Sequence, residues 1–316
     1  MRLNKLVKGE FEREGYRLIG RHSAVKICNW TKNALRNKGG CYKEKFYGID
    51  SHRCCQMSCT LTNCQNNCLH CWRNLNYTDY NRVKNPDLPS KIIDLCIKEQ
   101  QKILQGFKGN KKTRLNKFNE AMNPSQFAIS LTGEGTLYPY IGELISELRK
   151  RKITSFLVTN GLNPEVLEKL QKKKQLPTQL YLSVNAPNKE LFNKIVRSKL
   201  KNAWKIYLKT INLFPKLKTR KVIRLTLIKD LNMNNIEGYA DLIKIAKPDF
   251  VECKSYMAVG FSRQRLGYEK MPWHSEIREF SKQLAKLTDL KILDEKKESC
   301  VVLLGKTKKN MRIKTP

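Results

Sequence analysis

The segment CQNNCLHC, residues 64–71 of this 316-residue chain, carries cysteines at positions 64, 68 and 71. Thiolates are soft ligands that suit zinc and iron–sulfur clusters. A four-iron cluster normally takes four thiolates, so three cysteines would leave one iron without a protein ligand. On a helix the same cysteines would share one face and could be small core residues. The polar residues between them suit a loop better than a buried helix face, so the spacing predicts a loop that binds one inorganic centre.

The chain is strongly basic, with 62 Lys and Arg against 28 Asp and Glu and a formal net charge of +34. Such an excess favours a polyanionic partner, because neutralising phosphates releases counterions. A lysine-rich proteome and an anionic membrane surface are the competing explanations. Residues 1–10 contain no apolar stretch typical of a signal peptide, and no apolar run approaches the roughly 18 residues that span a bilayer. We therefore expect a cytoplasmic, monomeric protein that binds nucleic acid and does not enter a membrane.

Eleven cysteines in a protein expected in a reducing compartment indicate metal binding rather than disulfides. Most of them lie between Cys28 and Cys71, which strengthens that prediction. In this region Cys28, Cys41 and Cys54 are separated by twelve residues each, a spacing that by itself fits isolated structural thiols equally well. The sequence assigns no role to the remaining cysteines, which are Cys55, Cys59, Cys96, Cys253 and Cys300.

The chain is predicted to consist of an N-terminal extension, residues 1–55, and a core with a C-terminal segment, residues 56–316. From residue 56 onward short apolar runs alternate with helical patterns, which predicts an α/β fold of parallel strands joined by helices. Strands are predicted at 56–61, 127–131, 154–158, 180–184, 222–227 and 250–254. Helices are predicted at 90–104, 141–151, 164–172, 188–196, 204–213, 236–246 and 276–287, with Ser90 and Asn188 as N-caps. A run at 299–304 predicts one more strand, whose pairing the sequence does not give.

Polar or glycine-containing loops follow the first four predicted strands. The cysteine loop comes first, and TGEG at 132–135, TNG at 159–161 and NAP at 185–187 follow the next three. Because the reactive groups of β/α barrels gather at the carboxyl ends of the strands, we expect these loops to form one site. Taken singly, such motifs are also ordinary turns and capping residues.

The Cys-x3-Cys-x2-Cys spacing, followed by Gly133 and Glu134 after the next strand, resembles the radical S-adenosylmethionine (SAM) superfamily. That resemblance implies an open (β/α)6 partial TIM barrel with a [4Fe–4S] cluster on Cys64, Cys68 and Cys71. The open iron chelates SAM, and an electron from the cluster cleaves it to a 5′-deoxyadenosyl radical. The residues implied to contact SAM are His70, in place of the usual aromatic residue near the adenine, Gly133 and Glu134 near the amino group, and Asn160, Ser183 and Asn185 near the methionyl and ribose groups.

Further segments resemble the archaeal tRNA 4-demethylwyosine synthases: the cysteines at 28, 41 and 54, TGEGTLYP at 132–139, LSVNAP at 182–187 and KSYMAVGFSRQRL at 254–266. The resemblance implies a radical SAM enzyme that converts N1-methylguanosine-37 of tRNA-Phe, with pyruvate as the two-carbon donor, to tricyclic 4-demethylwyosine. We hypothesise that a radical on the methyl group of the nucleotide adds to the pyruvate carbonyl. Loss of the pyruvate carboxyl carbon and dehydration then close the ring.

The same resemblance assigns Cys28, Cys41 and Cys54 to a second [4Fe–4S] cluster with an open iron, and Lys43 to a Schiff base with pyruvate. A desolvated lysine near a positive centre can lose its proton and attack a carbonyl. Most lysines in so basic a chain lie on the surface. The sequence leaves open whether pyruvate binds Lys43, the open iron or both.

Arg263 and Arg265, with Phe261 beside them, are predicted RNA contacts, because guanidinium and aromatic groups stack on bases and bind phosphate. The target base should leave its stack to reach the mouth of the barrel. No flavodoxin-like segment is evident in the sequence, so an external electron donor is expected.

Two alternative interpretations stay open. One keeps radical SAM chemistry and changes the substrate to another RNA or a protein. The other is a non-catalytic, zinc-containing RNA-binding protein. The number of predicted β/α units argues against the second, since zinc modules are small.

Overall fold

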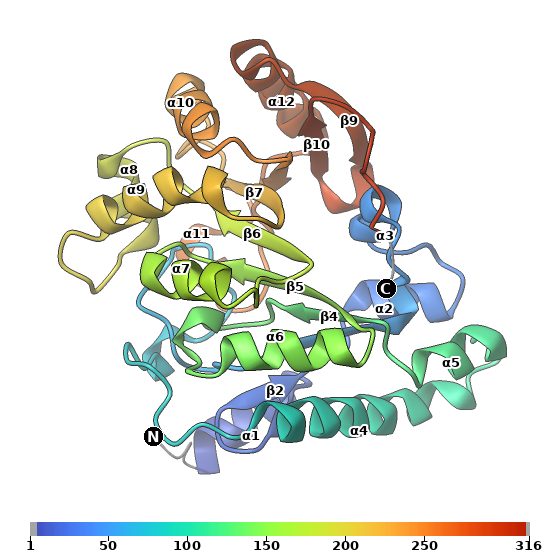
Figure 1. The fold of residues 1–316 in the computed structure, drawn as a ribbon. Helices are drawn as coiled ribbons and strands as arrows, with labels where there is room; N and C mark the ends of the chain where they lie inside the picture. The colour runs from blue at the N-terminus through green and yellow to red at the C-terminus, as the bar shows by residue number, and fades with distance from the viewer. Residues whose placement is uncertain (1–4, 314–316) are drawn as a thin grey trace.

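The computed structural model describes residues 5–313, and its centre is a run of six parallel strands (Figure 1). They are β3 (Cys54–Ser58), β4 (Gln126–Ile129), β5 (Thr154–Thr159), β6 (Gln179–Ser183), β7 (Arg220–Leu227) and β8 (Phe250–Ser255). They lie side by side in chain order, which confirms the predicted parallel strands. β3 ends earlier than predicted because the chain bends after Ser58, and the Leu61 backbone N–H donates to the His22 carbonyl at 2.8 Å.

Helices follow these strands along the chain, and most of them pack against one side of the sheet (Figure 1). They are α4 (Pro89–Lys108), α5 (Leu115–Ala121), α6 (Ile141–Lys150), α7 (Pro164–Lys172), α8 (Lys189–Val196), α9 (Ala203–Leu213), α10 (Ile236–Ala246), α11 (Ser262–Leu266) and α12 (His274–Thr288). Every predicted helix is present. Asn188 caps α8 as predicted, because its side chain accepts from the Leu191 backbone N–H. The prediction for Ser90 is wrong: Leu88 is the N-cap of α4, and Pro89 occupies the first helical turn, where its missing N–H costs nothing.

Antiparallel strands extend the sheet at both edges. A hairpin of β1 (Arg17–Ile19) and β2 (Ser23–Val25) pairs with β3, and β10 (Val301–Gly305) pairs with β8 and with β9 (Lys291–Lys296). The ten strands run in the order β1-β2-β3-β4-β5-β6-β7-β8-β10-β9. Because β3 pairs with β2 and β8 pairs with β10, β3 and β8 do not pair with each other and the barrel stays open. The open partial barrel is therefore confirmed, and the predicted strand at 299–304 is antiparallel to β8.

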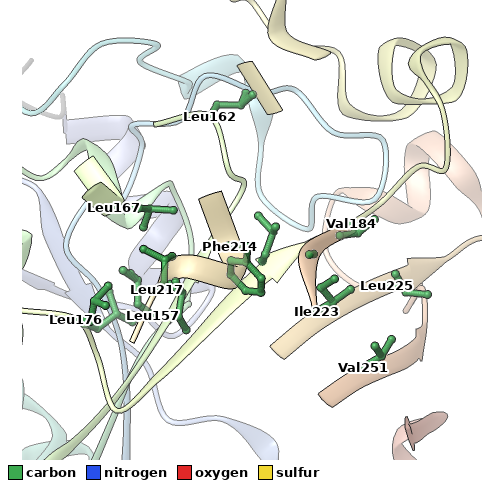
Figure 2. Packing of buried hydrophobic residues seen from close by; sticks show 14 of the residues in the cluster. Leu157, Leu162, Leu167, Leu176, Val184, Phe214, Leu217, Ile223, Leu225 and Val251 are labelled. Atoms are coloured by element: carbon green, nitrogen blue, oxygen red, sulfur yellow. The ribbon is translucent and has the colours of Figure 1, made fainter. Parts of the chain in front are cut away.

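The main hydrophobic core lies between the strands and the helices. There Leu157, Ile223 and Val251 of the strands pack in one cluster with Leu167 of α7 and with Phe214 (Figure 2). Burial of this apolar surface is the dominant favourable contribution to folding. Four of the unassigned cysteines belong to the same core and act there as small apolar residues: Cys55, Cys59, Cys96 and Cys253.

One helix of the N-terminal segment packs on the opposite, concave face of the sheet. This segment contains α1 (Lys5–Arg13), α2 (Asn29–Leu35), α3 (Tyr42–Tyr47) and the 3-10 helix η1 (Ser51–Arg53). In α3, Tyr42, Phe46 and Tyr47 pack in a second core with Phe156 of β5 and Tyr181 of β6. α3 therefore carries residue 43 onto the concave face. Other 3-10 helices are η2 (Leu75–Tyr77), η3 (Gly135–Leu137), η4 (Phe214–Lys216) and η5 (Lys297–Ser299).

The predicted division between residues 55 and 56 stays a prediction. In the structure β2 and β3 pair across this point, and the N-terminal segment shares a hydrophobic core with the sheet. Residues 1–4 and 314–316, which the predicted domains include, lie outside the described residues. Within residues 5–313, none of the helices has the length and apolar character needed to cross a membrane.

Candidate active site and metal centres

The cysteine loop, defined here as residues 59–74, contains no helix and no strand. Cys64, Cys68 and Cys71 are therefore not core residues of a helix. The Cys71 backbone N–H donates to the Cys68 carbonyl at 3.1 Å, and all three thiols are partly buried and free of disulfides. Burial, and then the neighbouring thiols of Cys64 and Cys71, raises the pKa of Cys68. The three thiols are thus near enough for Cys64 and Cys71 to act on Cys68, and the predicted cluster site stays a prediction.

Gly133, in the loop after β4, packs directly on the cysteine loop. Its φ is +70°, and a Cβ at this position would lie 1.7 Å from the Thr60 carbonyl oxygen. The next residue, Glu134, donates its backbone N–H to the Asn63 carbonyl at 2.8 Å. Because only glycine combines this backbone conformation with so close an approach, Gly133 sets the spacing between the two loops.

Glu134 is almost fully buried and joins the loops after β4 and β5. Its carboxylate accepts from the Thr136 N–H at 3.2 Å, the Thr136 hydroxyl at 2.6 Å, the Thr159 hydroxyl at 2.7 Å and the Asn160 N–H at 2.7 Å. Three of these donors meet Oε1 and one, the Asn160 N–H, meets Oε2, so Oε2 keeps an acceptor site. The predicted contact with the SAM ammonium stays a prediction. We assign Glu134 to positioning the two loops.

Asn160, after β5, contacts the first cysteine of the loop. Its Nδ2 donates to Gln65 Oε1 at 3.2 Å and lies 3.9 Å from Cys64 Sγ. Gln65 in turn donates from Nε2 to Asn163 Oδ1 at 2.9 Å and is almost fully buried. Gln65 therefore joins the cysteine loop to the loop after β5. The sequence carries no signal for this role, because a glutamine between two cysteines resembles any polar loop residue.

Two predicted SAM contacts have buried polar atoms without a hydrogen-bond partner in the described part of the chain: Nδ1 of His70 and Oδ1 of Asn185. Burial, and then Arg265, lowers the pKa of His70 to about 4, so its imidazole is neutral at pH 7. Ser183 is the last residue of β6, two residues before Asn185. Unpaired buried polar atoms cost free energy, and a polar ligand would supply the missing partners.

The predicted RNA contacts Arg263 and Arg265 have different surroundings. Arg265 donates from Nε to the Leu69 carbonyl at 3.1 Å and from Nη2 to the Cys71 carbonyl, so it positions the cysteine loop. Arg263 is exposed and donates from Nη1 to the hydroxyl of Tyr268, whose side chain is 64% exposed. Of the two, Arg263 is the one whose surroundings suit contact with RNA.

Cys28, Cys41 and Cys54 also come together. Cys28 is the N-cap of α2, Cys41 is the N-cap of α3, and Cys54 begins β3. The pKa of Cys41 is raised to about 11, because burial outweighs the opposing effect of Lys43 and the Cys28 thiol acts in the same direction as burial. The pKa of Cys54 is likewise raised by burial and by the thiols of Cys28 and Cys41. Helix starts and a strand start therefore assemble three cysteines that lie twelve residues apart in the sequence.

These two groups of thiols fit iron–sulfur clusters better than single metal ions. Among residues 5–313, no set of three or more His, Cys, Asp or Glu side chains is arranged to hold one metal ion. A cluster takes its thiolates on different irons, so its ligands need not converge on one point. Free, soft thiol donors in two groups of three agree with that requirement.

Lys43 is 8% exposed and lies on the concave face. Its Nζ is 5.0 Å from the ring centre of Phe156 and 4.8 Å from that of Tyr181. No group in residues 5–313 accepts a hydrogen bond from this Nζ. Burial, and then the guanidinium of Arg224, lowers the pKa of the amine, while Glu252 and the thiols of the second group oppose the shift.

Arg224 and Glu252 form a buried ion pair beside Lys43 that the sequence analysis missed. Arg224 Nε donates to Glu252 Oε2 at 2.9 Å, and Glu252 is fully buried. The same carboxylate accepts from the Tyr42 hydroxyl at 3.1 Å and from the Tyr47 hydroxyl at 2.7 Å. A charge pair on two neighbouring strands gives no local sequence signal, because its partners on α3 are about two hundred residues away.

A separate cavity of about 800 Å³ lies near the starts of β7 and β8. Its lining includes Arg220, Lys244, Lys247, Lys306 and Lys309. It contains none of the predicted site residues.

Comparisons with known proteins agree with this geometry. The family model described as Radical SAM superfamily matches residues 59–243, and the model described as Wyosine base formation matches residues 245–306. The S-adenosyl-L-methionine-dependent tRNA 4-demethylwyosine synthase of Pyrococcus horikoshii is 47% identical over 296 residues, which cover 93% of this chain and 86% of that protein.

Two solved structures are similar over almost the whole chain. A structure of TYW1 with a lysine-pyruvate adduct bound aligns with a TM-score of 0.87 and 34% identity, covering 99% of both chains. A crystal structure of archaeal TYW1 aligns with a TM-score of 0.80 and 30% identity, covering 98% of this chain and 99% of the other.

Proposed function

Because the chain belongs to the tRNA 4-demethylwyosine synthases of the radical SAM superfamily, we propose that it converts N1-methylguanosine-37 of tRNA-Phe to 4-demethylwyosine with pyruvate as the two-carbon donor. The proposed cofactors are SAM and two [4Fe–4S] clusters, one on Cys64, Cys68 and Cys71 and one on Cys28, Cys41 and Cys54. An external electron donor would supply the electrons. Bound together, the first cluster and SAM supply the radical chemistry. The observation that carries the proposal is a buried lysine, Lys43, beside the second group of thiols.

Lys43 has the surroundings that a Schiff-base lysine needs. It is buried against aromatic rings, and the neighbouring Arg224 favours its uncharged form. An uncharged amine is the nucleophile in imine formation. Phe156 and Tyr181 exclude water on one side, while the Nζ keeps its donors free of protein acceptors among the described residues.

The loops after the strands provide the polar groups for SAM. The neutral imidazole of His70 can stack on an adenine, and Oδ1 of Asn185 can accept a hydrogen bond from a ligand. Gly133, Asn160 and Arg265 hold the cysteine loop in one arrangement beside these groups.

The surface beside the cysteine loop suits an RNA loop. Trp72, directly after Cys71, is 40% exposed, and its backbone carbonyl accepts from the Phe261 N–H at 2.8 Å. This contact brings the exposed pair Arg263 and Tyr268 to the same region. Exposed aromatic rings with guanidinium groups bind unstacked bases and phosphates, and the base to be modified has to leave its stack.

The test is a single-turnover assay on anaerobically reconstituted protein with tRNA-Phe carrying N1-methylguanosine, SAM, a reductant and carbon-labelled pyruvate. We expect the tricyclic nucleoside with label from pyruvate in the tRNA digest, and no product from tRNA that lacks the methyl group. Lys43→Arg should abolish the product. Lys45→Arg, on the exposed side of the same helix, is the matched control and should retain it. Product formation that does not depend on pyruvate, or on the methyl group, would refute the proposal.

A further inference from the structure

The concave face carries more buried positive than negative charge. Lys43, Arg224 and Lys254 lie there, and the charge of Arg224 acts on both lysines. The carboxylate that faces all three is Glu252. The thiols of Cys41 and Cys54 also act on Lys43, and those of Cys41 and Cys300 act on Lys254. Buried charges need partners of opposite sign, so an anionic ligand would be favoured beside Arg224 and Lys43, which share a single carboxylate.

Glu252 is already engaged by the protein. It accepts from Tyr42, Tyr47 and Arg224, and its side chain is fully buried. These contacts fix the carboxylate to α3 and to β7. Glu252 therefore orients Arg224 and leaves Lys43 without a partner of its own.

The guanidinium of Arg224 has one nitrogen that donates to no group in the described part of the chain. Its Nε donates to Glu252 and its Nη2 donates to the Tyr42 hydroxyl at 2.8 Å, while its Nη1 has no acceptor among the described residues. The guanidinium carbon lies 4.6 Å from the ring centre of Tyr181. The same ring is 4.8 Å from the Nζ of Lys43. A fixed guanidinium and an amine without a hydrogen-bond acceptor among the described residues thus lie on one aromatic side chain.

We propose that Arg224 binds the carboxylate of pyruvate and so presents the adjacent carbonyl carbon to Lys43. The inference rests on the proposed function and adds a specificity-determining residue to it. The Lys43 amine attacks the carbonyl carbon, a C–N bond forms, and the carbonyl oxygen leaves as water with the two amine protons. A carboxylate adjacent to the ketone fits this pair of groups, and guanidinium is the side chain best suited to a planar carboxylate.

Lys254 is the other cation that could bind this carboxylate. Its Nζ already donates to the Ser299 carbonyl at 2.8 Å and lies 5.6 Å from the ring centre of Tyr42. It is therefore bound to η5 through one donor, and its ring contact is with Tyr42 and not with the Tyr181 ring beside Lys43. This difference makes Lys254 a matched control for Arg224.

The experiment traps the imine on the reconstituted full-length protein. Cyanoborohydride delivers a hydride to the imine carbon, a solvent proton completes the secondary amine, and intact-mass spectrometry measures the modified fraction against pyruvate concentration. Hydroxyacetone, a neutral ketone with the same carbon skeleton, is titrated in parallel. For Arg224→Gln we expect the half-saturating pyruvate concentration to rise about 10- to 100-fold relative to that of hydroxyacetone, as for loss of a hydrogen bond to a charged group. Lys254→Gln should keep the wild-type ratio.

The two substrates separate a specificity role from an indirect effect on Lys43. Removing the guanidinium also changes the charge near the amine, and that change acts on pyruvate and hydroxyacetone alike. The deciding quantity is the half-saturating concentration of pyruvate divided by that of hydroxyacetone. The inference is overturned if this ratio is unchanged in Arg224→Gln, or if it rises only in Lys254→Gln. Iron content and SAM cleavage of both variants show that they are folded. Absence of any pyruvate adduct in the wild-type protein would instead contradict the proposed role of Lys43.

Discussion

Replacing Gly133 with alanine should separate the loop after β4 from the cysteine loop. The new Cβ would lie 1.7 Å from the Thr60 carbonyl oxygen, whereas real Cβ atoms essentially never approach within 3.0 Å. The two backbone segments therefore have to move apart by at least 1.3 Å. Neither of them is the flexible end of a side chain, so the movement reaches the segment that leads to Cys64.

The free-energy cost of Gly133→Ala has two parts, the backbone conformation and the steric overlap, and the same substitution at Gly39 measures the first part alone. Gly133 has φ +70° and Gly39 has φ +85°, but a Cβ at Gly39 would meet nothing within 4 Å. Gly39→Ala should cost only the left-handed backbone conformation, about 1 to 2 kcal/mol. Gly133→Ala should cost this amount and about 1 to 3 kcal/mol more for overpacking. A displacement of about 1 Å in a reacting group can lower a rate about 100-fold, so SAM cleavage should fall by that order in Gly133→Ala alone.

The assay combines anaerobic urea unfolding with the rate of 5′-deoxyadenosine formation at saturating SAM. We expect Gly39→Ala to keep the wild-type rate and Gly133→Ala to lose both stability and rate. If Gly133→Ala is no less stable than Gly39→Ala and cleaves SAM normally, the loops are not held by this contact. The argument for the spacing role of Gly133 would then fail.

Iron analysis should find about eight irons per chain in the wild type, about four in Cys41→Ala and about four in Cys68→Ala, with SAM cleavage lost only in the latter. Cys253→Ala, in the core between the strands and the helices, should keep the wild-type iron content. Wild-type iron content in both Cys41→Ala and Cys68→Ala would contradict the two-cluster assignment. The pKa of Asp87 is lowered because hydrogen bonds from the Arg21 N–H and from Lys91 outweigh the opposing effect of burial. Its folded pKa is thus below its unfolded value of about 3.9, so it stabilises the fold above that pH and the contribution disappears as the pH falls through the folded pKa. Urea unfolding should show Asp87→Asn less stable than wild type at pH 6 and closer to it near pH 3, with exposed Asp241→Asn as the unaffected control.

The strands, the helices and the cysteine loop could be predicted because their signals are local. Alternation of apolar runs with helical periodicity sets the parallel sheet, and three cysteines within eight residues mark a ligand loop. Asn188 was a correct N-cap because the capping side chain and its N–H partner are three residues apart. Ser90 was a wrong one because Pro89 competes for the first turn.

The missed features depend on contacts between distant segments. The roles of Arg265 and Gln65 follow from carbonyl and amide partners that only the folded loop provides. The hairpin of β1 and β2 comes from strands too short to show a clear alternation. The pairing of β10 with β8 joins two separate segments, and no local pattern indicates which strand is the partner. Glu134 looked only like a ligand group in sequence, whereas in the fold its carboxylate also accepts four hydrogen bonds that join the loops after β4 and β5.

The attachment of α3 to Glu252 also has a consequence for biosynthesis. The hydroxyls of Tyr42 and Tyr47 donate to the carboxylate of Glu252, which is synthesised 210 and 205 residues later in the chain. At a ribosomal rate of about 5 to 20 residues per second, that interval lasts on the order of 10 to 40 s. During it Cys28 and Cys41 have no finished sheet to shield them, so their thiols are open to oxidants and to stray metal ions. Insertion of the second cluster should therefore be a late event in maturation, and air during synthesis should damage it more than air after folding.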